Sequence, residues 1–155
     1  MDGSRLLKFR DYTWSGVEKE PYKKGAEGCF CGIARNTIIG NKGEGVRFHL
    51  RYFEIPPGQG SSLEKHAHEH AVICVRGRGQ ALAGGAMHEL GSLDVLYIAP
   101  NAPHQLINPY NEPFGFFCVV DAERDRPKKL DKDDMARLDA SEETKGKYIG
   151  YVEGD

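Results

Sequence analysis

The chain has 155 residues, about the length of one domain, and its 21 lysines and arginines nearly balance its 23 aspartates and glutamates. A formal net charge of -2 gives no broad basic surface, so we do not expect nucleic acid as a partner. The sequence contains no apolar run long enough to cross a bilayer, and its N-terminus lacks the apolar stretch of a secretory signal. These features predict a cytoplasmic protein with neither a membrane nor a nucleic-acid partner.

The cysteines are Cys29, Cys31, Cys74 and Cys118, which are too few for a disulfide scaffold. The Cys29-x-Cys31 pair would place both thiols on one face of a strand, but a single such pair is weak evidence for zinc. We therefore expect reduced cysteines that pack as small hydrophobic residues.

Glycines and prolines are spread along the chain, which favours many short strands joined by tight turns. In chain order, residues 33–39 are the first candidate strand, and residues 46–55 alternate apolar and polar side chains before a Pro-Pro-Gly turn. Residues 71–75 form a continuous apolar run, which is typical of a strand buried on both faces. All three segments predict β-structure.

The second half of the chain continues this pattern. The Gly84-Gly85 pair between residues 80–83 and 87–90 favours a two-residue hairpin turn, because such turns need positive φ angles. Residues 93–98 and 114–120 predict two more strands, the last rich in aromatic and β-branched side chains. The chain from 46 to 121 is therefore predicted to be an all-β sandwich or small barrel.

The two flanks differ from this central barrel. Residues 1–45 are predicted to be an N-terminal arm that packs on the barrel. Residues 122–155 are predicted to be a charged C-terminal tail. Within that tail, Asp131–Leu138 has acidic residues early and a basic residue late, which favours a short helix.

Three of the six histidines lie within five residues, in the segment that runs from Glu64 to His70. In an extended chain every second side chain lies on the same face, so Glu64, His66, His68 and His70 would point the same way. Imidazoles and a carboxylate on one face suit a divalent transition metal. A ligand from a second strand would complete such a site, and His104 is the candidate. The alternative is a solvated, histidine-rich strand without a metal.

The two histidine segments resemble the paired motifs of the small single-domain cupins, G-x5-H-x-H-x(3 or 4)-E-x6-G and G-x5-P-x-G-x2-H-x3-N. His104-Gln105-Leu106-Ile107-Asn108 matches the end of the second motif, and Gly77 closes the first. Over about residues 46–120 the resemblance implies a double-stranded β-helix, the cupin jelly-roll barrel. It also implies one bound divalent metal: manganese, iron, nickel, copper or zinc.

The resemblance leaves two registers for the ligands. Counted back from Gly77, the ligand set is Glu64, His66, His70 and His104, with His68 as an alternative ligand or a general base. The competing register takes His66-x-His68 as the family's histidine pair, but it leaves too few residues before His70. In the second motif Leu93 stands where a glycine is expected, and Ala99 where a proline is common.

A narrower resemblance covers residues 51–54, 61–66 and 115–127. These segments are similar to the group of bacterial cupins that includes a methylthioxylulose phosphate methylsulfurylase. This resemblance implies a manganese-dependent enzyme that removes a methylthio group from a sugar phosphate in sulfur salvage. A thiol would then be needed as acceptor, and Cys118 is the candidate, unless it is an ordinary core cysteine.

We therefore predict a metal-dependent cupin that binds a small polar metabolite and acts on it as an enzyme. The alternatives are an iron-dependent dioxygenase and a non-catalytic small-molecule-binding cupin. The pocket residues that we expect are Arg51, Gln105 and Cys118, with His49 on the same strand face as Arg51. Residues 123–126 are interpreted as a solvated mixed-charge run. Pairing of exposed sheet edges favours a homodimer.

Overall fold

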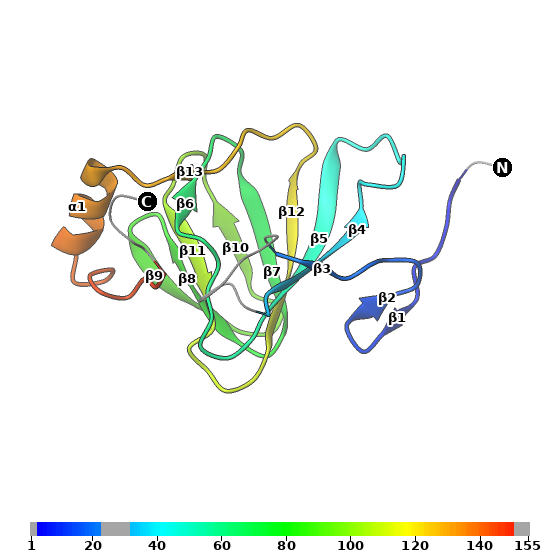
Figure 1. Cartoon of the computed structure of the whole chain (residues 1–155), viewed down its shortest axis with the longest axis horizontal. Helices are drawn as coiled ribbons and strands as arrows, with labels where there is room; N and C mark the ends of the chain where they lie inside the picture. Colours follow the sequence, from blue (N-terminus) through cyan, green and yellow to red (C-terminus); the bar gives the residue numbers. More distant parts are fainter. Residues whose placement is uncertain (1–2, 23–31, 151–155) are drawn as a thin grey trace.

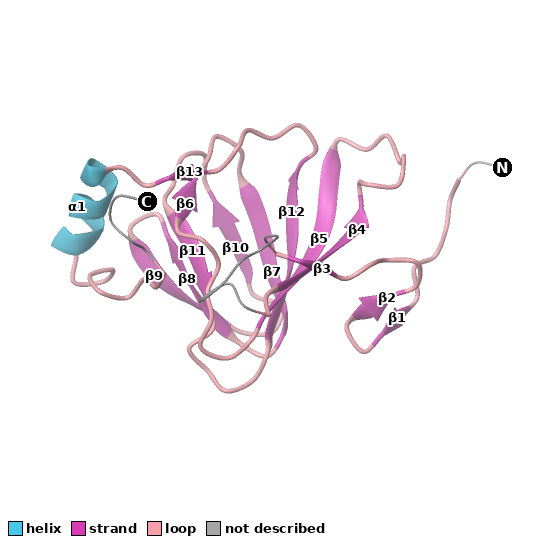
Figure 2. Cartoon of the chain, in the orientation of Figure 1, coloured by secondary structure: helices cyan, strands magenta, loops and turns pink. Residues whose placement is uncertain are grey.

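Strands make up nearly all of the regular structure in the computed structural model, which describes residues 3–22 and 32–150 (Figure 2). The Cys29 and Cys31 pair lies outside the described residues. The first strands are β1 (Phe9–Arg10), β2 (Thr13–Trp14), β3 (Glu20–Pro21), β4 (Ala34–Ile39), β5 (Phe48–Ile55), β6 (Glu64–Lys65) and β7 (His70–Arg76). They are followed by β8 (Gly79–Ala83), β9 (Ala86–Leu90), β10 (Val95–Ile98), β11 (His104–Ile107), β12 (Phe114–Asp121), β13 (Lys128–Lys129) and α1 (Lys132–Ala140).

Two antiparallel sheets form the body of the molecule (Figure 1). The larger sheet has the strand order β10-β7-β12-β5-β4-β3, and the smaller has the order β13-β6-β11-β8-β9. From β10 to β13 the chain passes from one sheet to the other at each successive strand, which is typical of a jelly roll. The prediction of an all-β double-stranded β-helix with a short C-terminal helix is confirmed.

The predicted strands lie close to their expected positions. The alternating segment 46–55 contains β5, and the apolar runs at 71–75 and 114–120 lie within β7 and β12. Gly84 and Gly85 have φ angles of 62° and 77°, so the β8–β9 turn uses the positive φ values that only glycine adopts without strain.

The core lies between the two sheets, where alternate side chains of each strand are buried. Phe114, Phe116, Cys118 and Val120 from β12 are all buried there, together with Val72 and Cys74 from β7. β12 is the central strand of this arrangement, because it pairs with β5 on one side and β7 on the other. Its register places Cys118 directly opposite Arg51 of β5 and Val120 opposite His70 of β7.

Both flanks pack on the barrel. The N-terminal hairpin places Trp14 against Tyr52 and Phe117, with ring centroids 5.1 and 5.6 Å apart, and β3 and β4 extend the larger sheet. The C-terminal helix starts with a capping box between Asp131 and Asp134. Its buried face packs on the smaller sheet through an apolar cluster of Leu63, Leu82, Leu130, Met135 and Leu138.

The turn that precedes β10 explains how the chain tolerates a departure from the second cupin motif. Leu93, which replaces the expected glycine, has a φ angle of 67°, the left-handed conformation that a glycine adopts without strain. Hydrogen bonds from Asp94 N to Gly91 O, at 3.0 Å, and from Gly91 N to the Asp94 side chain, at 2.8 Å, hold the turn. The backbone shape of the motif is therefore kept despite the substitution.

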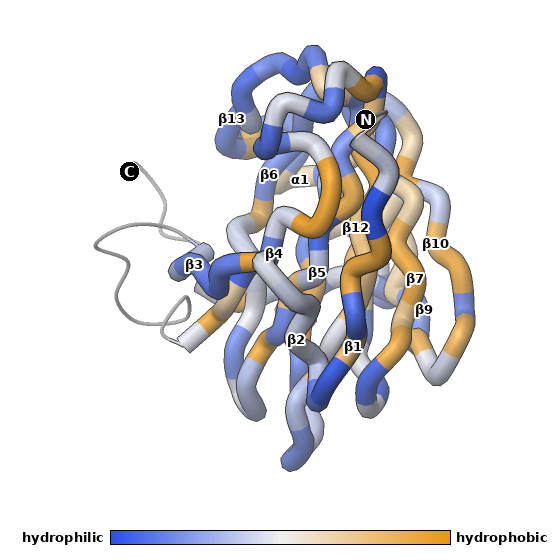
Figure 3. The backbone as a smooth tube through the Cα atoms, turned by 90° about the vertical axis from the view of Figure 1, so that its right-hand side faces the viewer, coloured by the Kyte–Doolittle hydropathy of each residue, from blue (hydrophilic) through white to orange (hydrophobic). Residues whose placement is uncertain are grey.

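The edge of the larger sheet at β10 carries three exposed apolar side chains. Leu93, Val95 and Tyr97 are 73%, 67% and 64% exposed, and apolar residues continue along β7 and β12 (Figure 3). The homodimer that such an edge would favour stays a prediction.

No helix within residues 3–22 and 32–150 is long and apolar enough to span a membrane.

Gly77 is expected to be the most sensitive glycine of the β7–β8 turn. It has a φ angle of 60°, and a Cβ atom there would lie 2.3 Å from the backbone oxygen of Pro113. Replacement of Gly77 by alanine should lower the free energy of unfolding by about 2–4 kcal/mol, from strain and steric overlap together. Gly43→Ala, at a φ angle of 79° with open space around it, should lower it by only about 1 kcal/mol. Equal shifts of the urea midpoints would contradict this explanation.

Candidate metal centre

Three histidines from both sheets meet inside the barrel. His70 opens β7 in the larger sheet, His104 opens β11 in the smaller sheet, and His66 lies just after β6. Their ligand nitrogens all lie within 4.8 Å of one another. Glu64 of β6 lies directly opposite His104 in the strand register, so the antiparallel pairing brings the carboxylate to the same region.

Backbone contacts fix how two of these rings are turned. His66 Nδ1 lies 2.7 Å from the carbonyl oxygen of His68, and His104 Nδ1 lies 2.9 Å from that of Ala102. Because a carbonyl oxygen only accepts hydrogen bonds, each Nδ1 carries the proton and each Nε2 has a free lone pair. Nδ1 bound to a backbone carbonyl is the usual support for a histidine that binds a metal through Nε2.

His70 completes the group. Its Nε2 lies 2.7 Å from Nε2 of His66, and its Nδ1 lies 2.9 Å from the sulfur of Cys118. Two lone pairs do not approach so closely unless a proton or a cation lies between them, so the pair is suited to share a cation. The donor set of three imidazole nitrogens fits a divalent transition metal.

The environment keeps the three rings neutral. Burial, together with the nearby His104 and His66, lowers the pKa of His70 to about 2. Burial likewise lowers the pKa of His66 and of His104, which are only 3% and 4% exposed. A neutral imidazole is the form that binds metals, so protons do not compete strongly for these nitrogens near neutral pH.

His68 belongs to a second, neighbouring group. Its ring stacks on that of His66 at a centroid distance of 3.6 Å, and its Nδ1 lies 2.9 Å from a carboxylate oxygen of Asp125. Asp125 also accepts the backbone N–H of Ala67, at 2.8 Å, and that of His68, at 3.2 Å. The segment after β12 is thereby fastened over the loop that carries the histidines.

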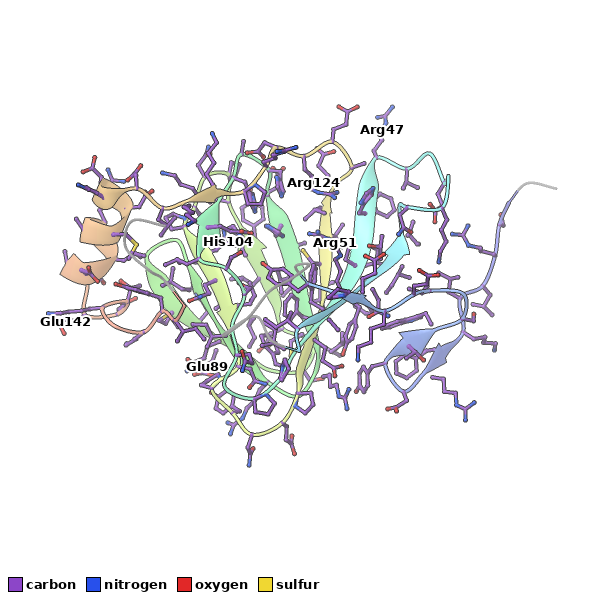
Figure 4. The ribbon with its side chains drawn as sticks, in the orientation of Figure 1. Arg47, Arg51, Glu89, His104, Arg124 and Glu142 are labelled. Carbon is purple, nitrogen blue, oxygen red and sulfur yellow. The ribbon has the colours of Figure 1, made fainter. Side chains whose placement is uncertain are left out.

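A cavity of about 280 Å³ opens beside the three histidines. Arg51 and His104, which come from opposite sheets, both line it (Figure 4). Cys118 lies in its wall, 2% exposed, with the guanidinium of Arg51 3.6 Å from its sulfur. The other polar residues that line the cavity are Tyr22, Arg35, Ser61, Glu64, Arg124 and Asp125, together with His66, His68 and His70.

Two residues of the second motif, Gln105 and Asn108, bind backbone groups and do not line the cavity. Gln105, which we expected at the pocket, faces away from the cavity because side chains alternate along β11 and His104 takes the inward position. Its amide binds the backbone of Ile149 in the C-terminal tail, at 2.6 and 3.0 Å. Asn108 is fully buried and donates to the carbonyl oxygens of Ile55 and Glu112, which fixes the loop before β12.

The sequence interpretation missed three charged residues that line the cavity: Arg35, Arg124 and Asp125. Residues 123–126 were interpreted as a solvated run, which is wrong for Arg124 and Asp125. The alternating charges gave no signal, because the contacts of this segment are with β5 and the histidine loop, far away in the sequence. His49 does not line the cavity, but its Nδ1 lies 3.0 Å from the guanidinium of Arg124, which does.

Comparison with known proteins assigns the chain to a family. The cupin domain family model matches residues 51–120. The chain is 37% identical to 1-methylthio-D-xylulose 5-phosphate methylsulfurylase from Rhodospirillum rubrum over 131 residues, which are 84% of this chain and 83% of that protein. The chain belongs to the cupin family.

Solved cupin structures have the same fold. A cupin 2 conserved barrel domain protein from Rhodopseudomonas palustris superposes with a TM-score of 0.79 at 37% identity, covering 89% of this chain and 94% of that one. A cupin 2 domain-containing protein from Halorhodospira halophila superposes with a TM-score of 0.73 at 38% identity, covering 96% and 97%. The implied jelly-roll fold is thus shown, and the histidine cluster is this cupin's candidate site for one metal ion.

Proposed function

We propose that this cupin is a metal-dependent enzyme that removes the methylthio group from a 1-methylthio ketose phosphate and passes it to a thiol. The relative from R. rubrum is named for action on such a compound, and it spans most of this chain. The observation that carries the proposal is the position of Cys118. Its sulfur lies in the cavity wall, between His70 of the histidine cluster and the Arg51 guanidinium.

The metal ligands that we propose are His66, His70 and His104, with Glu64 as the fourth. Glu64 lines the same cavity and accepts a hydrogen bond from the Ser62 hydroxyl. Manganese is the ion that we propose, in keeping with the resemblance stated above. A divalent metal held there supplies Lewis-acid polarisation of the substrate carbonyl.

The role of Cys118 is that of a nucleophile. Burial raises the pKa of its thiol, whereas the positive charges of Arg51 and Arg124 oppose that rise. If His70 held a cation through Nε2, its proton would be on Nδ1 and would point at the sulfur, so two N–H donors would face the thiolate. This arrangement stabilises the charged form that attacks.

The methylthio transfer needs one external reactant, a low-molecular-weight thiol. The Cys118 thiolate attacks the methylthio sulfur, a sulfur–sulfur bond forms, and the bond from sulfur to C1 of the ketose breaks. Its electron pair moves to C1, which takes up one proton, equal to the proton that the thiol gave up. We propose that His68, whose Nδ1 lies against Asp125, carries that proton. A low-molecular-weight thiol then attacks the mixed disulfide, releases the methylthio group and restores Cys118.

An assay on the purified, manganese-loaded protein tests this function. We expect 1-methylthio-D-xylulose 5-phosphate and an added thiol to give the 1-deoxy ketose phosphate and a methylthio disulfide in equal amounts, without uptake of oxygen. Removal of the metal by a chelator should abolish the reaction, and added manganese should restore it. Absence of products with every divalent metal would refute the proposal. Oxygen uptake with an iron-loaded protein would favour the dioxygenase instead.

A further inference from the structure

Three arginines line the cavity from three separate elements. Arg35 comes from β4, Arg51 from β5, and Arg124 from the segment after β12. We propose that these three side chains form an anion subsite, which holds the phosphate group of the substrate at the end of the cavity away from the histidines. The identity of the phosphate ester rests on the proposed function, but the subsite itself can be tested with inorganic phosphate.

The strand order separates the two ends of the cavity. β4, β5, β12 and β7 are successive neighbours in the larger sheet, and they carry Arg35, Arg51, Cys118 and His70 in that order. Neighbouring strands are about 4.8 Å apart, so β5 and β7 are about 10 Å apart, with Cys118 on the strand between them. A short phosphorylated sugar can therefore reach from the histidines, past the thiol, to the arginines.

Arg124 is held at the arginine end by two contacts. Its Nη1 lies 3.0 Å from His49 Nδ1 and donates to the carbonyl oxygen of Asp121 at 2.7 Å. His49 is two residues before Arg51 on β5, so both side chains lie on the same face of that strand. The segment that is fastened to the histidine loop through Asp125 thus also brings a guanidinium to β5.

The arginines keep donors that no protein group satisfies. Within residues 3–22 and 32–150, Nε of Arg35 and Nε of Arg51 are buried without a hydrogen-bond partner. Buried donors are nearly always paired in folded proteins, so two such atoms in arginines that line one cavity indicate a missing acceptor. Guanidinium groups match the oxygens of a phosphate in geometry and charge.

The charges around the three arginines also favour an anion at this place. Burial lowers the pKa of Arg124, and the positive charges of Arg51 and Arg35 lower it further, so the three guanidinium groups lie in one another's field. Glu20 pairs with Arg35 at 3.0 Å, but among the residues that the structure describes no carboxylate forms an ion pair with Arg51 or Arg124. A dianion at this place would relieve the repulsion among them.

Calorimetric titration of inorganic phosphate into metal-free protein tests the subsite without the metal as a competing binder. We expect binding by the wild-type protein, and dissociation constants at least about tenfold higher for Arg51→Met and Arg124→Met, because each loses charge-assisted donors. Arg47→Met is the matched control, since Arg47 is exposed near the same end of β5 but does not line the cavity (Figure 4). It removes the same charge and should bind phosphate as the wild type does.

A second titration identifies the ligand class. A pentulose 5-phosphate should bind the wild-type protein at least about tenfold more tightly than the pentulose without phosphate. If wild-type protein fails to bind phosphate at millimolar concentration, or if Arg124→Met and Arg47→Met bind it equally, the subsite is refuted. If Arg51→Met does not fold, Arg124→Met alone tests the subsite, because Arg124 lies outside the sheet. Phosphate binding without methylthio transfer would refute the proposed function and leave the subsite standing.

Discussion

Replacement of Cys118 by serine is expected to abolish methylthio transfer while the metal stays bound. Serine keeps a hydrogen-bond acceptor beside His70 Nδ1, so the ring stays oriented and the ligand set is unchanged. Its hydroxyl is far less ionised than a thiol and cannot form the mixed disulfide. Removal of a covalent nucleophile reduces turnover on the scale of 10³-fold or more, and we expect a loss of at least about that size. Initial rates and metal content should be measured on the same sample.

Cys74 provides the matched control for this variant. It is also fully buried, on β7, but its sulfur lies near the carbonyl oxygens of Arg76 and Gly77 and does not line the cavity. Cys74→Ser should leave methylthio transfer per folded molecule within about threefold of wild type, although it buries a hydroxyl and lowers stability by about 1–3 kcal/mol. Retention of activity in Cys118→Ser would show that the acceptor thiol is not Cys118.

Replacement of His104 by alanine is expected to remove the metal. His104 is one of the three clustered histidines, so without it only His66 and His70 remain as imidazole ligands. Loss of a group that merely supports a ligand weakens metal binding about 10–100-fold, and loss of the ligand itself should exceed that. Elemental analysis of the purified variant should show a metal content well below one equivalent per chain, with no methylthio transfer.

Two further variants test the composition of the ligand set. His88→Ala removes an exposed histidine on β9 outside the cluster and should retain the full metal content. Glu64→Gln should weaken metal binding at least about tenfold if Glu64 is the fourth ligand, whereas His68→Gln should leave it nearly unchanged. Full metal content in His104→Ala would place the metal site elsewhere, and the opposite order of the Glu64 and His68 effects would make His68 the fourth ligand.

Local patterns predicted most of the barrel. The alternation before the Pro-Pro-Gly turn, the Gly84-Gly85 pair and the apolar run in β12 each depend on neighbouring residues, and each was found as expected. The helix α1 was predicted from the acidic residues at its start and the basic residue near its end. The bounds of the short strands β6, β11 and β13 were not predicted, because two to four residues are too few to show a period and pairing partners decide their conformation.

The site was predictable only where its residues carry a local signature. Closely spaced histidines and the segment that starts at His104 stood out, and the structure brings His66, His70 and His104 together. Arg35 and Arg124 had no such signature, because isolated charged residues look alike until the fold brings them to one cavity. Gln105 was misplaced because the direction of a side chain depends on strand register, which residue type does not reveal.

The most direct test of the central claim is the mass of the Cys118 peptide after metal-loaded protein reacts with 1-methylthio-D-xylulose 5-phosphate in the absence of any other thiol. The account predicts one methylthio group per chain, attached to Cys118 through a disulfide, together with one equivalent of the 1-deoxy ketose phosphate. The adduct should disappear when a low-molecular-weight thiol is added. An unmodified Cys118 alongside formation of the deoxy sugar would contradict the account, because the methylthio group would then leave without passing through this residue.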